Sequence, residues 1–361
     1  MHANPLFKNL NILDLSSVLA GPSVGTFFAE LGADVTKIEH PDHPDATRTW
    51  KQSIEDEESN VSAYFSSINY KKKYLQLNLK KESHNTELMM MVEKADIVLM
   101  NFKKGAQEKL NITDEQLRNV NSRIIIGKIS GFGDESDRVA YDLVLQAETG
   151  FMSMNGTPES GPVKMPLAFI DILAAHQLKE GLLIELIKKE KLKKNYVGKS
   201  VSVSLYDAAI SALTNQASNY LMTGKIPERI GSLHPNIAPY GELFTTKDGK
   251  TLTFAIGSNT HFNKLCSYLG VAELTDDSRF NNTKHRVENR TELEQLLAEQ
   301  VKKRNANEIL SALNAQFVPC GEIKDLKAVF EEREAQALVR EENIEGVSTK
   351  RVSSIAFKQS T

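Results

Sequence analysis

The chain has 361 residues, and 44 Lys and Arg against 47 Asp and Glu leave a formal net charge of −3. A charge this close to zero disfavours a broad nucleic-acid surface, and no apolar run approaches the roughly 18 residues of a membrane-spanning helix. The two cysteines, Cys266 and Cys320, exclude a disulfide framework and a multi-cysteine zinc site. Since the N-terminus lacks the basic start and apolar core of a secretory signal, we expect a cytoplasmic protein.

The first 135 residues show alternating strand and helix patterns. Residues 11–15 (NILDL) form a short apolar run, residues 21–32 have helical spacing that ends on a glycine, and residues 34–39 (DVTKIE) alternate as a strand does. A strand–helix–strand unit with short links favours a parallel pair with a right-handed crossover. The same theme continues in strand patterns at 75–79, 97–101 and 123–131 and a helix pattern at 82–94. Together they predict an α/β fold.

The second half of the chain indicates a further unit. A helix is predicted at 172–189, a strand at 201–206 and a helix at 208–222. After a turn signal at 247–249 (KDG), the patterns indicate a strand at 251–256 and helices at 260–269, 291–303, 307–315 and 325–340.

Ligands of open α/β sheets bind at the carboxyl ends of strands, so the turn at 16–22 (SSVLAGP) is a candidate site. It lacks the G-x-G-x-x-G of dinucleotide-binding folds, which disfavours an NAD enzyme even though Glu39 stands where such folds carry an acidic ribose ligand. A plain turn into a packed helix fits this stretch equally. Three lysines at 71–73 either solvate a sheet edge or anchor a phosphate, and the glycine loop at 130–133 would bring backbone N–H groups close to such a ligand.

Asp171 stands where an apolar run (PLAFI) meets a helical pattern. An N-cap is the common role of aspartate at such a place, and a capping residue can also present its carboxylate to a cleft. Carboxylates act as covalent nucleophiles, and an apolar setting sharpens their reactivity. The sequence leaves both roles open.

Other catalytic signatures are missing from the sequence. The eight histidines form no H-x-x-x-H or H-E-x-x-H pair, so we expect no metal site. No G-x-S-x-G occurs, which disfavours a hydrolase with a nucleophile elbow.

Taken together, these segments resemble the family III CoA-transferases, also called the CaiB/BaiF family. The resemblance covers nearly the whole chain and is strongest from residue 11 to residue 181. Its carriers are 12–22 (ILDLSSVLAGP), 31–41 (LGADVTKIEHP), 69–79 (NYKKKYLQLNL), 95–106 (ADIVLMNFKKGA), 130–133 (SGFG), 141–156 (YDLVLQAETGFMSMNG), Asp171 with its helix, 197–208 (VGKSVSVSLYDA), 239–249 (PYGELFTTKDG) and 318–323 (VPCGEI).

The resemblance implies a Rossmann-like large domain built from both chain ends, with a smaller α+β domain inserted between them and two chains interlocked as a homodimer. We assign residues 1–195 and 322–361 to the large, CoA-binding domain and residues 223–300 to the small domain. Residues 196–222 and 301–321 are then linking segments.

The resemblance also implies a CoA site in the large domain. By position it falls on Val18, Leu19, Ala20, His40, Leu77, Asn78, Leu79, Lys80, Asn101, Phe102, Lys103, Lys109, Ser130, Gly131, Phe132 and Gly133. Many relatives have an arginine where this chain has His40, and some have a lysine where it has Ser130.

The family nucleophile corresponds to Asp171. The implied reaction is acyl-CoA:carboxylate CoA transfer through an aspartyl anhydride and an aspartyl-CoA thioester, with an acyl-CoA and a small carboxylic acid as partners. Coenzyme A is then a substrate, and no separate cofactor is expected. A 2-methylacyl-CoA racemase is the alternative, although its histidine would stand at position 141, where this chain has Tyr141. A non-catalytic CoA-binding paralogue is a further alternative.

Overall fold

The computed structural model describes residues 6–358, and the chain divides into two compact units. The larger unit comprises the residues up to 152, residues 164–226 and the residues from 336 onward. The smaller unit comprises residues 153–163 and 227–335. Residues 301–321, which we assigned to a linking segment, lie within the smaller unit, and residues 322–335, which we assigned to the large domain, lie there as well.

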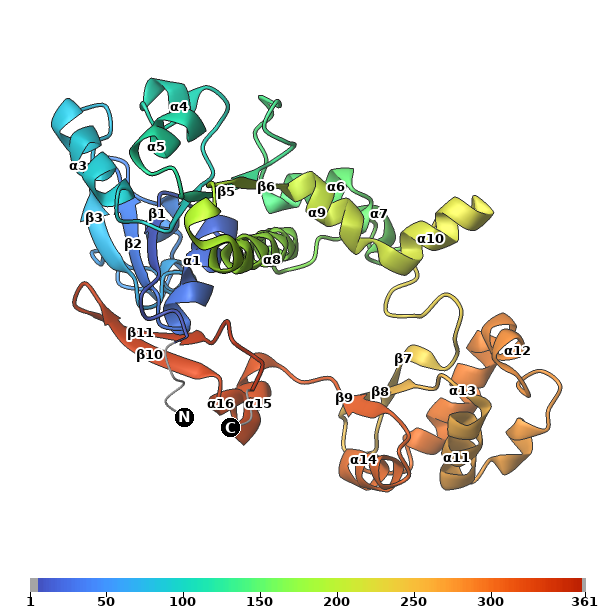
Figure 1. Cartoon of the computed structure of the whole chain (residues 1–361). Coiled ribbons are helices and arrows are strands. Elements are labelled where there is room, and N and C mark those ends of the chain that lie inside the picture. Colours follow the sequence, from blue (N-terminus) through green and yellow to red (C-terminus); the bar gives the residue numbers. More distant parts are fainter. Residues whose placement is uncertain (1–5, 359–361) are drawn as a thin grey trace. The chain divides into compact units, whose positions relative to one another are not determined.

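A six-stranded parallel sheet forms the centre of the larger unit (Figure 1), and its strand order is β3-β2-β1-β4-β5-β6. The strands are β1 (Asn11–Asp14), β2 (Asp34–Glu39), β3 (Lys73–Gln76), β4 (Ile97–Met100), β5 (Ile125–Ser130) and β6 (Ser200–Ser204). The chain runs outward from β1 to β3, returns to pair β4 with the other side of β1, and runs outward again. The α/β prediction is therefore confirmed.

Both faces of the sheet are covered, as the continuous apolar run of the central strand β4 requires. In β4 all four residues are buried, and alternate side chains enter different cores because successive residues of a strand point to opposite faces. Ile97 and Leu99 pack with the helices α1 and α8, whereas Val98 and Met100 pack with α3 and α5.

The helices of the larger unit lie in these two layers and around the carboxyl end of the sheet. They are α1 (Ala20–Glu30), α2 (Ala63–Ser67), α3 (Glu82–Val92), α4 (Ala106–Lys109), α5 (Asp114–Val120), α6 (Asp142–Glu148), α8 (Phe169–Leu192), α9 (Leu205–Ala212) and α10 (Thr214–Thr223). Short helices α7 (Phe151–Met154) and α16 (Arg333–Gln336) span points where the chain passes between the units. Within residues 6–358, no helix is both long and apolar enough to cross a membrane.

Two segments differ from the sequence prediction. The helix predicted at 325–340 is replaced by α15 (Leu326–Phe330), α16 and then a hairpin of β10 (Val339–Ile344) and β11 (Val347–Val352). The hairpin turns at Glu345 and Gly346, which adopt φ angles of 48° and 91° that no helix contains. The third strand ends at Gln76 rather than at residue 79, because Asn78 accepts the backbone N–H of Lys80 through its side chain and starts a turn.

The smaller unit has its own core. Its antiparallel sheet has the order β7-β8-β9, with β7 (Tyr240–Thr245), β8 (Thr251–Ala255) and β9 (Cys320–Glu322). The helices α11 (Asn259–Leu269), α12 (Thr283–Glu288), α13 (Arg290–Val301) and α14 (Ala306–Ala315) accompany it. Phe244 and Phe254 of the sheet form one buried cluster with Leu265, Leu297 and Leu313 of the helices.

Candidate active site

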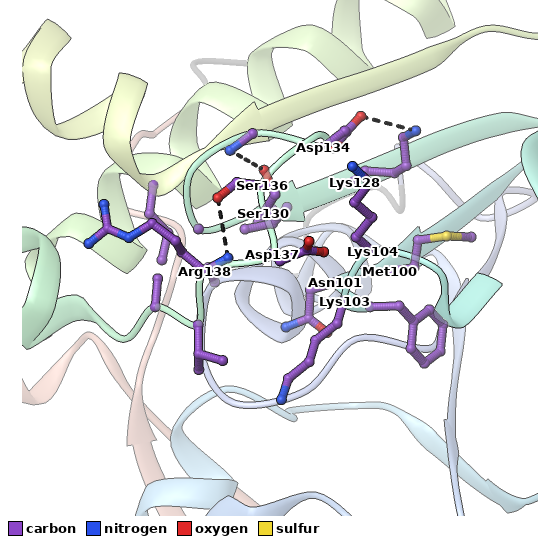
Figure 2. Close-up of a pocket in the computed structure, with 18 of the residues that line it drawn as sticks. Met100, Asn101, Lys103, Lys104, Lys128, Ser130, Asp134, Ser136, Asp137 and Arg138 are labelled. Carbon is purple, nitrogen blue, oxygen red and sulfur yellow. Dashed lines mark hydrogen bonds and ion pairs between the residues drawn. The ribbon is translucent and has the colours of Figure 1, made fainter. Parts of the chain in front are cut away.

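A cavity of about 470 Å³ opens at the carboxyl end of the sheet (Figure 2). In this strand order the connections after β1 and β4 leave in opposite directions, which creates the crevice in which open α/β sheets bind ligands. Its lining comes from residues 17–20 after β1, residues 100–105, 107 and 108 after β4, residues 128–131 and 133–141 from β5 onward, and also Asp171 and Leu205.

The turn after β1 is held in an unusual conformation from two sides. Val18 has a φ angle of 71°, in the left-handed region that costs energy for a β-branched residue. Its backbone N–H donates to both carboxylate oxygens of Asp45, at 3.1 and 3.2 Å. The side chain of Asn101 accepts the N–H of Ser17 at 3.0 Å and donates to the Ser17 carbonyl at 2.8 Å. The turn is therefore fixed by groups from two other segments.

A buried ion pair supports the same turn from below. The Lys37 ammonium lies 3.0 Å from the Asp45 carboxylate, and both side chains are 1% exposed. Lys37 also donates to the carbonyl of Ser16 at 2.7 Å. Because neither charge is left without a partner, the pair can remain in the interior while it orients the turn.

A second buried pair lies at the end of β1. The Asp14 carboxylate accepts a hydrogen bond from Lys72 at 2.8 Å, and both side chains are fully buried. Burial acts to raise the pKa of Asp14, but the charges of Lys72 and Lys37 outweigh burial and lower it. Gly25 of α1 leaves room for the pair, since a Cβ there would lie 3.0 Å from Asp14 Oδ2 and 3.2 Å from Lys72 Nζ.

The carboxylate of Asp171 has a different environment. Asp171 lies in the first turn of α8 and lines the cavity. Within residues 6–358, no hydrogen bond or ion pair to its side chain is found. Burial, and to a smaller extent the charge of Asp142, raise the pKa of Asp171 from an ordinary 3.8 to about 7. This carboxyl group therefore titrates near neutrality, as reactive groups in clefts often do.

Asp142 contacts the start of α8 from the neighbouring helix α6. Its Oδ1 accepts the backbone N–H of Ile170 at 2.8 Å, and its other oxygen accepts the side-chain amide of Gln146. Gln146 in turn accepts the N–H of Met165 at 2.8 Å. These bonds tie the segment that leads into α8 to the body of α6.

Aromatic side chains lie around the same carboxyl groups. The charges of Asp171 and Asp142 add to burial in raising the pKa of Tyr64 to about 12, so the phenol stays protonated. The Trp50 ring lies 5.1 Å from that of Tyr64 and 6.5 Å from that of Tyr141, measured between centroids. Tyr141 also lines the cavity.

The loop after β5 forms the remaining wall. Gly133 has a φ angle of 96° and donates its N–H to Ser130 Oγ at 3.1 Å. The basic side chains of Lys103, Lys104 and Lys128 belong to the lining, and the dashed line at Asp134 in Figure 2 joins it to Lys128, 3.3 Å away. Lys104 and Lys128 form ion pairs with acidic side chains, whereas Lys103 forms no ion pair within residues 6–358, so its ammonium group and the backbone N–H groups of the glycine loop are suited to an anionic ligand.

The structure brings together a large part of the predicted site. Besides Asp171, the cavity is lined by the predicted residues Val18, Leu19, Ala20, Asn101, Phe102, Lys103, Ser130, Gly131 and Gly133. The other predicted residues lie outside this lining, and they are His40, Leu77, Asn78, Leu79, Lys80, Lys109 and Phe132.

Those outlying residues differ in their surroundings. Leu77 is buried in the core, Lys80 and Lys109 are exposed, and His40 stacks on His43 with 5.1 Å between ring centroids. Phe132 packs against the core and has the Arg138 guanidinium 3.8 Å from its ring centre.

Four polar residues that act on the site carry no motif in the sequence. Lys37, Asp45, Tyr64 and Asp142 were not singled out, although Lys37 and Asp142 lie within stretches that carry the family resemblance. A buried lysine requires a partner, but the strand that holds Lys37 (DVTKIE) alternates polar and apolar residues, so the sequence does not indicate that this lysine is buried.

Comparison with known proteins adds independent findings. Residues 7–357 match the sequence model described as "CoA-transferase family III". The succinate–glutarate CoA-transferase of Agrobacterium fabrum is 33% identical over 339 residues, which cover 92% of this chain and 84% of that protein. The acetyl-CoA:oxalate CoA-transferase of Acetobacter aceti is 33% identical over 324 residues, covering 89% and 81%. The crystal structure of a CaiB/BaiF family protein from Brucella suis is similar with a TM-score of 0.82 and 34% identity, covering 96% of this chain and 91% of that one.

Proposed function

The chain belongs to CoA-transferase family III, and from this premise we propose that it transfers coenzyme A from an acyl-CoA to a small carboxylic acid with Asp171 as the nucleophile. The observation that carries the proposal is the environment of the Asp171 carboxylate. It lines the cavity, titrates near neutrality, and has no hydrogen bond or ion pair within residues 6–358 that would occupy its oxygens.

In the first half of the proposed reaction, the Asp171 carboxylate attacks the thioester carbonyl of the acyl-CoA. The carbon–sulfur bond breaks, CoA leaves as a thiolate, and an acyl–aspartyl anhydride forms. The thiolate then attacks the aspartyl carbonyl of that anhydride. This step releases the donor acid as a carboxylate and leaves a β-aspartyl thioester between Asp171 and CoA.

The second half repeats these steps with the acceptor. The carboxylate of the incoming acid attacks the aspartyl thioester and displaces the CoA thiolate, which gives a new anhydride. The thiolate attacks the acceptor's carbonyl, so that the new acyl-CoA forms and the Asp171 carboxylate is regenerated. No step requires a net gain or loss of protons or electrons.

For the acids, we propose short dicarboxylates. The names of several relatives specify succinate, glutarate, oxalate or mesaconate, all of which carry two carboxyl groups. The second carboxylate of such an acid needs a cationic or hydrogen-bonding partner, and the cavity lining supplies lysines and backbone N–H groups.

A racemase is the alternative reaction. It would need a second acid–base group opposite Asp171, and histidine is the usual choice near neutral pH. The described cavity lining contains Tyr141 at the expected place and no histidine. These observations favour transfer over racemisation.

We also propose that the chain acts as a homodimer, as the family resemblance implies. The helix α10 supports this, since Leu221 and Met222 are 78% and 86% exposed and the helix has no buried residue. A sedimentation experiment at micromolar concentration should give the mass of two chains, and the mass of one chain would contradict the proposal.

Transfer itself is tested by incubating the protein with succinyl-CoA or acetyl-CoA and a panel of free acids, with new acyl-CoAs detected by mass spectrometry. We expect exchange with the wild type and none with Asp171→Asn, whose amide has the same shape but cannot form the anhydride. Exchange at the wild-type rate in the Asn variant would refute the proposed role of Asp171. Solvent deuterium entering the α-carbon without any acceptor acid would instead indicate the racemase.

A further inference from the structure

The helix that carries Asp171 begins without a side-chain cap of its own. Ala168 occupies the N-cap position of α8 and has no side-chain oxygen, so the first N–H groups of the helix need acceptors from elsewhere. Asp142 supplies one, because its Oδ1 accepts the N–H of Ile170 at 2.8 Å. Ile170 is fully buried and directly precedes Asp171 in the chain.

Gln146 adds hydrogen bonds that link Asp142 to the segment before the helix. It bonds Asp142 through its amide N–H and accepts the N–H of Met165 at 2.8 Å. The same amide group lies 3.3 Å from the carbonyl of Leu167. Asp142 and Gln146 are 9% and 1% exposed, so solvent does not compete with these bonds.

The charge of Asp142 is not neutralised. Within residues 6–358 it forms no ion pair, in contrast to the buried carboxylates Asp14 and Asp45. The groups that interact electrostatically with the site are Asp142 from α6, Tyr64 from α2 and, through Tyr64, Asp45. Tyr64 is protonated, so Asp142 is the charge that acts on Asp171.

We propose that Asp142 is a positioning residue for the nucleophile: its hydrogen bond to Ile170 fixes the backbone that carries Asp171, and its unpaired negative charge adds to burial in moving the transfer reaction to higher pH. This inference rests on the proposed function of Asp171. A carboxylate near the nucleophile disfavours a second negative charge, so more of the Asp171 side chain is protonated at a given pH, and the part that is ionised is the more basic nucleophile.

Two variants separate the two roles of Asp142. Asp142→Asn keeps an oxygen for the N–H of Ile170 but removes the charge. Asp142→Ala removes both, and we expect kcat to fall about 100-fold at every pH with KM for the acyl-CoA nearly unchanged, because a misplaced reacting group costs turnover rather than binding. Adding Gln146→Glu to Asp142→Asn restores both an acceptor for the new amide and a nearby negative charge, so it should recover kcat and return its pH dependence towards that of the wild type.

If Asp142 had only a structural role, its replacement by Asn would not shift the pH profile of kcat. For a carboxylate that titrates near pH 7, wild-type kcat should fall about tenfold between pH 8 and pH 6. In Asp142→Asn the acidic limb should move to lower pH, so that the fall over this interval becomes smaller. If Asp142→Asn has the wild-type kcat and its acidic limb lies at the wild-type pH, the inference is wrong.

Glu185→Gln provides the matched control. Like Asp142→Asn, this substitution removes the charge of a buried acid. Glu185 lies on α8, where it pairs with Lys188 at 2.6 Å and accepts the Tyr196 hydroxyl at 3.0 Å. It lies 14 residues from Asp171, or about 21 Å along the helix, so the profile should not move.

A second measurement, the pH dependence of stability, does not depend on turnover. The free energy of unfolding of the wild type should fall as the pH rises towards 7, and in Asp142→Asn this fall should end at lower pH. Absence of transfer in the wild type would refute the proposed function, whereas identical unfolding profiles of the wild type and Asp142→Asn would refute the inference about Asp142.

Discussion

Two carboxylates of the larger unit, Asp14 and Asp171, have opposite environments. Asp14 is fully buried, and Lys72 lies 2.8 Å away, so its pKa is lowered. Asp171 faces the cavity without a cation, and burial and Asp142 raise its pKa to about 7. The larger unit thus has a paired structural carboxylate whose pKa is lowered and an unpaired carboxylate whose pKa is raised.

The difference shows how the site is built. The paired charges lie under the turn after β1 and hold Ser16 and Val18 in position through Lys37 and Asp45. They stabilise a rigid wall and have no free oxygen to offer a substrate. The unpaired carboxylate of Asp171 also lines the cavity, and its lone pairs are available for bond formation. The following predictions test this contrast.

Removing the cation from the paired carboxylate should have the largest effect on stability. Lys72→Met leaves Asp14 buried with its main partner gone, and we expect the free energy of unfolding to fall by about 3–5 kcal/mol. The control is Lys73→Met, which breaks the exposed 2.6 Å pair with Asp34 next to it and should cost less than about 1 kcal/mol. Urea denaturation measures the free energy of unfolding of both variants. Equal losses of stability would contradict the structural role of the buried pair.

Removing the charge of the unpaired Asp171 carboxylate should instead increase the free energy of unfolding. A folded-state pKa raised from 3.8 to about 7 contributes stability that is complete below pH 3.8 and is lost as the pH rises through 7. Asp171→Asn avoids this loss, so it should match the wild type near pH 4 and exceed its stability by on the order of 2 kcal/mol at pH 8. Thermal unfolding across this pH range is the measurement, and a less stable Asn variant at pH 8 would show that the carboxylate is paired after all.

The smallest expected effect concerns the cavity lysines. Lys103 lines the cavity, and its replacement by Ala should weaken CoA binding about tenfold if it bonds a phosphate, whereas exposed Lys194 should be replaceable without change. Lys80→Ala tests whether the CoA site extends beyond the cavity. A tenfold loss there would carry the CoA site beyond the cavity to the end of β3, and unchanged calorimetric affinity would restrict it to the cavity.

Much of the larger unit could be predicted because local patterns and global fold agree. The apolar runs at 11–15 and 97–101 are buried strands, and the turn after the first of them does line a cavity. Asp171 was found from an apolar run that ends on a carboxylate at a helix start. The family resemblance, drawn from ordered motifs along the chain, is confirmed by the family match over residues 7–357.

The remaining features depend on contacts between distant segments. The pairing of Asp14 with Lys72 spans 58 positions and that of Arg351 with Glu30 spans 321, and no periodicity indicates either. The hairpin at 339–352 was not predicted, and its first two residues were included in a helix, because its residues are largely charged and lack the alternation of a half-buried strand. Asp142 was overlooked because its partner is a backbone N–H, which leaves no trace in the sequence.

The most direct test of the central claim follows oxygen into Asp171. The protein is allowed to turn over with an acyl-CoA donor and an acceptor acid whose carboxylate carries heavy oxygen, and the peptide containing Asp171 is then analysed by mass spectrometry. Because the acceptor attacks the aspartyl thioester through one oxygen and that oxygen remains when the thiolate attacks the acceptor's carbonyl, the Asp171 carboxylate should gain the label, and quenching during turnover should trap CoA on the same residue. New acyl-CoA formed with neither label nor adduct on Asp171 would contradict the account.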